Sequence, residues 1–350
     1  MHTCKVTIGS LLGLSLLMLN SSCGGGGGMA NGGGGTGPAS SSVYVTSVLL
    51  APLPSSILGF PTSANGWISP TSTIKGSSNS FFNGLAVDAA GNVYVGAAPD
   101  NSGNGGIEIL VYAPGASGTA TPIRTISGAA TGLEVLGQNS ISALAVDSVG
   151  NIYVLAQTSE SQGDLGVSIF SAGASGDVAP TRVVSGSATN IEFPGQIAVD
   201  SAGNIYVANS PLQGAAASIL IFGSSASGNV APTSVLGGSD TTMNSIQGLA
   251  VDNAGNIYVA VNGTNLAGGT PGILEFNAGS TGNVAPVRTI SGPATTIIGL
   301  GNVAVDGAGS VYLLSGPGIL KFASNVMGDA APTATITSTS LAGDDCIAVQ

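Results

Sequence analysis

Histidine and cysteine are almost absent from this 350-residue sequence. The one histidine is His2, in an N-terminal segment that we expect to be removed, so Ser-His-Asp and Cys-His catalytic sets and imidazole metal sites are excluded from the mature chain. The three cysteines are Cys4, Cys23 and Cys346. Cys4 lies in the segment that is removed and Cys23 at the point where we expect lipidation, so one thiol remains and forms no internal disulfide framework. The sheet core must therefore stabilise the fold.

Charged residues are also scarce, at 7% of the sequence. Six lysines and arginines stand against 17 aspartates and glutamates, which gives a formal net charge of -11. Nucleic acid is therefore excluded as a partner, because binding to the phosphate backbone needs clusters of lysine and arginine. The 56 glycines are instead typical of an exported, β-rich protein with many turns.

Residues 1–22 have the pattern of an export signal. Lys5 precedes an apolar run from Val6 to Leu19, which has the length of a secretory hydrophobic segment and is short for a membrane span. The segment from Asn20 to Cys23 resembles a bacterial lipoprotein signal, and this resemblance implies that Cys23 is lipidated and anchors the chain to a membrane. Asn20 stands where that family favours leucine, and simple secretion by cleavage near Ser22 is the alternative.

Residues 23–42 are glycine, serine, threonine and asparagine with almost no apolar side chains. Such a segment cannot bury a core, so we expect a flexible tether. Together with the signal, it predicts a globular domain, residues 43–350, that is held at the membrane surface facing the periplasm or the cell exterior, or is secreted.

A hairpin-like segment recurs through the rest of the chain. Each copy has a short apolar strand, a turn of the form Asp-x-x-Gly and a second strand rich in β-branched and aromatic residues. The copies are Leu85–Val95, Leu144–Val154, Ile197–Val207, Leu249–Val259 and Val303–Leu313. One aspartate per turn invites a metal or catalytic interpretation. We favour a turn role, because aspartate at this position accepts backbone N–H groups and glycine at the fourth position can take a positive φ.

Two further elements recur between the hairpins. One is an apolar run that ends in an aromatic residue: 57–60, 107–112, 167–170, 219–222, 273–276 and 319–322. The other is a β-rich segment that starts with proline: 70–74, 122–126, 180–184, 232–236, 286–290 and 332–336. Proline cannot donate a ladder hydrogen bond, so we place this last strand outermost. Four strands (A, B, C and D) at a period of 52 to 59 residues predict an all-β, six-bladed β-propeller.

The two ends of the domain supply complementary strands. Before Leu85 the chain has a B strand at 43–45, a C strand and a D strand, and after the last D strand it has only an A strand at 347–349. These four strands complete a sixth blade, so the C-terminal strand should close the ring against the N-terminal ones. An open solenoid is the alternative, but it gives no reason to divide one unit between the two ends.

The repeated residues resemble the NHL-repeat family of six-bladed propellers over Val43 to Gln350. The Asp-x-x-Gly turn and its flanking strands carry the resemblance, and the tyrosine of each B strand is expected to pack between blades. The charged residue that the family has after the B strand is replaced by Gly96, Leu155, Ala208 or Ala260. The C-to-D loop is also longer than in the family.

Propellers generally bind ligands at the mouth of the central channel, where the D-to-A and B-to-C loops meet. Nine residues near the starts of the A strands are not explained by the repeat, and we predict that they form a ligand-binding face: Phe81, Phe82, Asn83, Ser142, Phe193, Gln196, Gln247, Asn302 and Asp345. The phenylalanines could instead cap the core, and the amides could hold ordered water.

Three functions fit these observations. The first is a non-enzymatic scaffold, monomeric and without cofactor or metal, which binds a protein or glycan of the cell envelope through this face. The second is a metal-dependent lactonase or lyase, implied by resemblance to six-bladed enzymes such as gluconolactonase, with Asp345, Asn83 and Asn302 as oxygen ligands. One carboxylate is few for such a site. The third is a structural domain that acts through its outer strands.

Overall fold

The computed structural model describes residues 41–47, 55–76, 81–98, 106–133, 141–157, 165–210, 216–262, 269–316, 318–341 and 344–350. The predicted signal segment, Cys23 and the tether up to residue 40 lie outside these ranges. None of the described residues belongs to a helical segment with the length and hydrophobicity that a membrane span requires.

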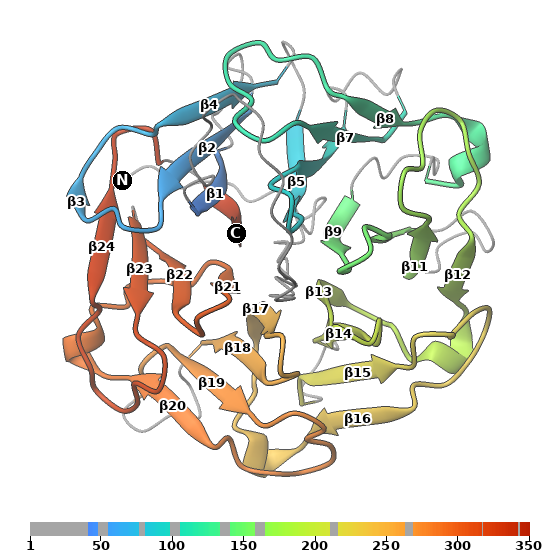
Figure 1. Cartoon of the computed structure of the whole chain (residues 1–350). Coiled ribbons are helices and arrows are strands. Elements are labelled where there is room, and N and C mark those ends of the chain that lie inside the picture. Colours follow the sequence, from blue (N-terminus) through green and yellow to red (C-terminus); the bar gives the residue numbers. More distant parts are fainter. Residues whose placement is uncertain are drawn as a thin grey trace, which may run out of the picture.

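The strands form six antiparallel sheets arranged in a ring around a central axis (Figure 1). This confirms the predicted six-bladed propeller. Blade 1 has the strand order β25-β1-β2-β4, blade 2 contains β5 to β8, blade 3 β9 to β12, blade 4 β13 to β16, blade 5 β17 to β20, and blade 6 β21 to β24 with β3 added at its edge.

Each blade runs from an innermost A strand to an outermost D strand. The A strands are β25 (Asp344–Val349), β5 (Phe81–Val87), β9 (Ile141–Val146), β13 (Pro194–Val199), β17 (Ile246–Val251) and β21 (Val303–Val305). The B strands are β1 (Ser42–Ser47), β6 (Val93–Ala98), β10 (Ile152–Gln157), β14 (Ile205–Asn209), β18 (Ile257–Val261) and β22 (Val311–Ser315).

The C strands are β2 (Ser56–Pro61), β7 (Glu108–Tyr112), β11 (Leu165–Phe170), β15 (Ser218–Phe222), β19 (Gly272–Phe276) and β23 (Gly318–Phe322). The D strands are β4 (Ser72–Lys75), β8 (Arg124–Ile126), β12 (Arg182–Ser185), β16 (Ser234–Gly237), β20 (Arg288–Ser291) and β24 (Ala334–Thr337). In each blade the repeated proline lies just before the D strand, which is outermost as predicted.

The two ends of the domain close the ring in blade 1. Strand β25 pairs antiparallel with β1, with Val43 opposite Val349 and Val45 opposite Ile347. The backbone N–H of Gln350 also donates to the carbonyl of Ser42 at 3.0 Å. The predicted closure is therefore confirmed, and β25 is longer than expected because it begins at Asp344.

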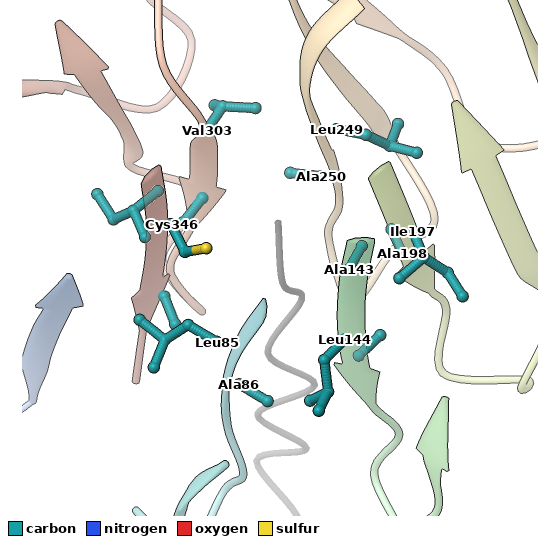
Figure 2. Packing of buried hydrophobic residues seen from close by; sticks show 14 of the residues in the cluster. Leu85, Ala86, Ala143, Leu144, Ile197, Ala198, Leu249, Ala250, Val303 and Cys346 are labelled. Atoms are coloured by element: carbon teal, nitrogen blue, oxygen red, sulfur yellow. The ribbon is translucent and has the colours of Figure 1, made fainter. Parts of the chain in front are cut away.

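Alanine occupies the same central position of all six A strands. Ala86, Ala145, Ala198, Ala250, Ala304 and Ala348 are all fully buried. Small side chains allow the innermost strands to approach one another around the axis, and larger apolar residues such as Leu85, Leu144 and Ile197 precede them (Figure 2). The phenylalanines that end the C strands are buried as well, so the core runs continuously around the ring.

The carboxylate of the aspartate in each A-to-B turn accepts hydrogen bonds from nearby residues. In blade 4, Asp200 Oδ1 accepts the backbone N–H of Ala202 at 2.9 Å and of Asn204 at 2.8 Å. Its Oδ2 accepts the Asn204 side-chain amide at 2.8 Å and the Tyr206 hydroxyl at 3.1 Å. Asp88, Asp147, Asp252 and Asp306 also bind both turn N–H groups and the B-strand tyrosine. The turn role is confirmed.

The long C-to-D loops cover the outer edge of the neighbouring blade. Gly228, in the loop of blade 4, donates its N–H to Val183 of β12 at 2.6 Å and accepts the N–H of Ser185 at 3.3 Å. Equivalent parallel bridges join Ile74 to Gly118, Ile126 to Gly176, Leu236 to Gly282 and Ile290 to Gly328. At the sixth boundary, β3 (Gly66–Trp67) pairs with β24. Each loop therefore closes an edge that would otherwise be open to another chain.

Short 3-10 helices follow four of the D strands and were not predicted. They are η1 (Ala129–Thr131), η2 (Ser187–Thr189), η3 (Ser239–Thr241) and η5 (Pro293–Thr295). Each begins after a glycine with φ between 111° and 128°. The side chain of Asp177, Asn229, Asn283 or Asp329 in the next blade accepts a backbone N–H of the helix at 2.6 to 2.7 Å. These contacts add a second link between blades.

Basic side chains strengthen the same boundaries. Arg124 and Arg182 donate to the loop carbonyls of Ala174 and Ala226, at 3.2 Å and 2.8 Å, and Arg288 makes the equivalent contact in blade 5. In blade 6 the cation comes from the C strand instead, where Lys321 donates to Thr62. Most of the six lysines and arginines in this chain thus link blades.

Candidate functional site

The predicted binding face lies at the end of the ring where the A strands begin. Five of the six A strands carry an irregularity in their pairing near this end. In blade 4, Gly195 falls between the paired residues Pro194 and Gln196, so the register shifts there. Bulges of this kind redirect the side chains beside them. They allow Gln196 to leave the regular pattern of the blade.

Gln196 joins three neighbouring blades through its side chain. Its Nε2 donates to the backbone carbonyl of Gln247 in blade 5 at 3.1 Å. Its Oε1 accepts Nδ2 of Asn302, in the segment that leads into blade 6, at 3.3 Å. Gln247 in turn donates from its Nε2 to the hydroxyl of Ser245 at 2.9 Å. Three of the nine predicted residues are therefore brought together in one hydrogen-bonded group.

The residues of this amide group differ in solvent exposure: some are buried and others are accessible to a ligand. Gln196 and Asn302 have exposed fractions of 1% and 0%, whereas Gln247 and Ser245 are half-buried. Both ends of the Asn302 amide are also occupied, because Oδ1 accepts the N–H of Val303 at 2.9 Å. Asn302 therefore holds the mouth in shape, and Gln247 is the amide of this group that a ligand can reach.

The other predicted residues have different environments. Asn83 is buried and Ser142 is half-buried, each in the A strand of its own blade. Phe82 is fully buried and belongs to the core, because large apolar side chains are most stable away from water. Phe193 is half-buried. The side chains of Phe81 and Asp345 lie outside the described part of the structure.

The polar residues also occupy two successive positions rather than one. Gln196 and Asn302 come immediately before the first apolar residue of their repeats, Ile197 and Val303. Asn83, Ser142, Gln247 and Asp345 stand one residue earlier. They are therefore not equivalent members of a single ring, and the amide group lies over blades 4 to 6.

Two residues at the ends of B strands hold the loops of this face and were not predicted. Asn209 Oδ1 accepts the N–H groups of Glu192 and Phe193 at 3.0 and 3.1 Å. In blade 6, Ser315 accepts the N–H of Ile298 at 2.9 Å and donates to Gly299 at 3.1 Å. Their signal in the sequence is a polar residue that ends an otherwise apolar strand. These contacts fix the position of Phe193 and Ile298 beside the mouth.

The ionisable groups with clearly shifted pKa values lie away from this face. Burial, together with the neighbouring Asp88, raises the pKa of Tyr94 to about 12. Burial and the turn aspartate also raise the pKa of Tyr153, Tyr206 and Tyr312, and for Tyr258 burial, Glu275 and Asp252 raise the pKa. Among the described residues, no group of three or more His, Cys, Asp or Glu side chains could hold a metal ion. The described part of the mouth offers amide, hydroxyl and apolar groups, and the exposed Glu192 lies in the same loop as Phe193.

No family model matches the sequence. No curated protein matches it either. Among solved structures, a protein of unknown function from Bacteroides caccae aligns with a TM-score of 0.56 and 12% identity, over 88% of this chain and 98% of that chain. This likeness over nearly the whole of both chains shows a shared fold.

Two further solved structures are similar to this chain. PorZ, a surface component of the type-IX secretion system of Porphyromonas gingivalis, aligns with a TM-score of 0.47 and 16% identity, over 81% of this chain and 39% of that chain. The PQQ-bound aldose sugar dehydrogenase of Streptomyces coelicolor aligns with a TM-score of 0.45 and 16% identity, over 85% of this chain and 84% of that one.

Proposed function

We propose that this propeller is a non-enzymatic binding protein of the cell envelope, which holds a protein or glycan at the channel mouth over blades 4 to 6. The observation that carries the proposal is the amide group of Gln196, Gln247 and Asn302, joined across these blades by hydrogen bonds. A fixed array of amide and hydroxyl groups beside Phe193 offers both polar and apolar contacts to a partner.

The opposite end of the ring supports this choice of face. There the aspartate, asparagine and tyrosine of each turn bind one another, as Asp200 and Tyr206 do, and the same residues recur in most blades. At the mouth the residues differ from blade to blade, as Phe193, Ser245 and Ile298 show. Residues that the repeat does not require are free to serve recognition.

The rim is a weaker candidate for partner binding. The loop of the following blade already occupies backbone groups of the D strands, as Gly228 does with Val183 and Ser185. A partner therefore cannot easily add a strand there, and binding at the rim would depend on side chains.

The cellular setting is part of the same proposal. Residues 1–22 direct export, Cys23 carries a lipid anchor, and the tether holds a monomeric, NHL-like propeller near the membrane surface. The pattern of an apolar run followed by Cys23 and a glycine-rich segment supports this setting. Metabolic labelling with a radioactive fatty acid checks it, because a Cys23→Ser variant should lose the label and enter the soluble fraction.

Cosedimentation with isolated cell envelopes tests the binding face. The double variant Phe193→Ala, Gln247→Ala should bind about tenfold more weakly than the parent, because an aromatic anchor and an accessible amide are lost. The control is Val149→Ala, which removes a side chain with an exposed fraction of 71% from a turn at the opposite end. Equal binding by the double variant and the parent would contradict the proposal. A rise in Tm with excess calcium or manganese would instead favour a metal-dependent enzyme.

A further inference from the structure

The single tryptophan of this chain is exposed on the outer rim of the ring. Trp67 has an exposed fraction of 72%, the highest among the large apolar residues that the structure describes. It belongs to β3, which pairs with the outermost strand of blade 6, so it lies at the rim and away from the channel mouth (Figure 1). Tryptophan has a large apolar area, and its exposure costs free energy that contact with a partner recovers.

The fold does not require a tryptophan at this position. Gly66 pairs with Ile336 as the equivalent loop glycines of the other blades pair with their D strands. The residue after the glycine is Trp67 in blade 1, and in blades 2 to 6 it is Thr119, Asp177, Asn229, Asn283 and Asp329. The last four accept an N–H of a 3-10 helix in the preceding blade. The described residues after β24, 338–341, form no such helix. The capping role is therefore absent at this boundary.

The backbone on both sides of the tryptophan is held against blade 6. Asn65 Oδ1 accepts the N–H of Thr335 at 3.0 Å, and the N–H of Ile68 donates to the carbonyl of Thr337 at 2.9 Å. The nearby residues Ser63 and Ser69 are small and exposed, so they leave the indole unshielded. The loop therefore presents one aromatic side chain to solvent from a fixed backbone.

The blade whose loop carries this tryptophan has no acidic residue on three of its four strands. All 17 aspartates and glutamates stand at or after Asp88, so β1 to β4 contain none, and neither does the neighbouring β24. The acidic residues of blade 1, Asp344 and Asp345, belong to its innermost strand, β25. Lys75, which ends β4, is exposed, and Lys321 of blade 6 contacts the loop. In a chain with a net charge of -11, an anionic surface repels this sector least.

The chain enters the propeller beside the same loop. Thr62, near the start of the loop, donates its N–H to the carbonyl of Ser41 at 3.0 Å, and the two hydroxyl oxygens lie 2.7 Å apart. Ser41 is the first residue that the structure describes. The glycine-rich segment that separates it from Cys23 has an expected span of roughly 23 Å. A lipid anchor at Cys23 would thus keep this loop within reach of the bilayer surface.

We propose that the loop of residues 62–71 is the surface through which the propeller rests on a lipid bilayer, with the indole of Trp67 in the headgroup region. Tryptophan favours this region because its ring is apolar and its N–H can bind water and headgroups. Lys75 adds attraction to anionic headgroups. The inference rests on the lipid anchor of the proposed function, because one inserted side chain gives only weak binding by itself. Contact through the rim leaves the channel mouth open to its partner.

The fluorescence of Trp67 tests this contact, because the chain has no other tryptophan. The lipidated protein is purified from membranes and reconstituted into vesicles of phosphatidylcholine and phosphatidylglycerol. Its emission maximum should lie at shorter wavelength than that of soluble Cys23→Ser protein in buffer. Lipids brominated near the headgroup should quench the emission more than lipids brominated near the chain ends, as expected for a ring at the interface.

A relocated tryptophan gives the control for this measurement. The double variant Trp67→Thr, Val149→Trp has the threonine that blade 2 carries at the loop position, and it moves the fluorophore to an exposed turn of blade 3. The variant remains anchored at Cys23, but brominated lipids should not quench its emission. Equal quenching of the two proteins would show that the bilayer contact has no preferred side.

Thr71→Glu and Thr181→Glu form a matched pair. Each loses a hydroxyl hydrogen bond to the C strand of its blade, at 3.1 Å and 2.9 Å, but only Thr71 lies in the loop of Trp67. On vesicles that contain phosphatidylglycerol, Thr71→Glu should reduce the quenching of Trp67, because the added carboxylate is repelled by the anionic surface. Thr181→Glu should leave the quenching unchanged.

The outcomes separate this inference from the proposed function. Failure of the parent to incorporate the fatty acid label at Cys23 would overturn the anchor and the inference together. With the label present, an unquenched Trp67, equal quenching of the relocated tryptophan or equal effects of the two glutamate variants would overturn the inference alone. An emission shift with soluble peptidoglycan fragments but not with vesicles would also overturn it, in favour of a glycan at this loop.

Discussion

Blade 1 and the five continuous blades reach the same four-stranded sheet by different connections. In a continuous blade, a covalent turn joins strands A and B, and an aspartate such as Asp200 accepts four hydrogen bonds there. In blade 1 the A strand is β25, and Gln350 stands where the other blades have aspartate. The B-strand tyrosine of this blade, Tyr44, therefore has no turn aspartate beside it.

Side-chain hydrogen bonds at the other end of blade 1 replace part of what the turn supplies. The hydroxyl of Thr46, which is fully buried, accepts the N–H of Cys346 at 3.1 Å. Ser47 donates to the carbonyl of Ser340 at 3.0 Å. The continuous blades have Gly96, Leu155, Ala208, Ala260 or Leu314 at the position of Thr46. The comparison shows that strands A and B can be held together either by a covalent turn or by hydrogen bonds from two buried hydroxyl groups.

Removal of Asp344–Gln350 should have the largest effect on this comparison. The deletion removes β25 and leaves the hydrogen-bonding edge of β1 unpaired. It also removes the buried side chains of Cys346, Ile347 and Val349 from the core. The expected loss is about 5 to 8 kcal/mol, which is comparable with the whole stability of a domain. Urea unfolding followed by circular dichroism measures it. Removal of Gln350 alone is the control, and a truncated chain as stable as the parent would contradict the closure.

High pH should destabilise the continuous blades more than blade 1. Tyrosine has an ordinary pKa of 10.0, and burial together with Asp147 raises the pKa of Tyr153 further than this. The folded state thus favours the protonated phenol, so its contribution to stability is complete below pH 10 and falls as the pH rises toward the folded pKa. The free energy of unfolding should therefore decrease above pH 10.

The matched variants are Tyr153→Phe and Tyr44→Phe. For Tyr44, burial raises the pKa but a hydrogen bond with Ser42 lowers it, and no aspartate contributes. Tyr153→Phe should therefore reduce the alkaline loss of stability more than Tyr44→Phe does. Urea titrations at a series of pH values measure this difference. Equal changes in the two variants would show that the turn aspartate has no part in it.

Asp200→Ala should cost about 2 to 4 kcal/mol, because it leaves the Asn204 amide and the Tyr206 hydroxyl of a continuous blade without their shared acceptor. Gln350→Ala changes the corresponding position of blade 1 and should alter stability by less than about 0.5 kcal/mol. Chemical unfolding of both variants gives the two values. If Gln350→Ala lowers the free energy of unfolding as much as Asp200→Ala does, the two positions contribute equally to stability and the comparison fails.

Thr46→Val should have a smaller effect than Asp200→Ala, at about 1 to 2 kcal/mol. The two side chains have the same shape, but valine leaves the N–H of Cys346 without an acceptor in a buried place. The rate at which a thiol reagent modifies Cys346, a fully buried cysteine, should increase in parallel, since opening of β25 exposes it. Thr125→Val in the D strand of blade 2 is the control, and it should change neither quantity.

The repeats predict the ring because each blade carries the same local signals. The Asp-x-x-Gly turn, the alternation of apolar residues and the division of one unit between the two ends all depend on short segments, and the structure confirms the six blades and their closure. The contacts between blades were not predicted. The loop around Gly228 has no hydrophobic period, and its partner, Val183, belongs to a different repeat.

The candidate site was only partly predictable for a related reason. The sequence indicates polar residues at the starts of A strands, but the direction of Gln196 depends on a register shift and its partner Asn302 lies two blades away. Phe82 is in the core because its strand begins earlier than the repeated motif suggests.

The hydrogen bond between Gln350 and Ser42 shows that the two ends of the propeller lie side by side, so the order of the strands along the chain can be changed without changing the fold. Since these residues already touch, a short linker between them would make a circular chain, and new termini could be opened at the A-to-B turn of another blade. Such a circular permutant should assemble the same six sheets, with the two-part blade moved to a new place in the ring.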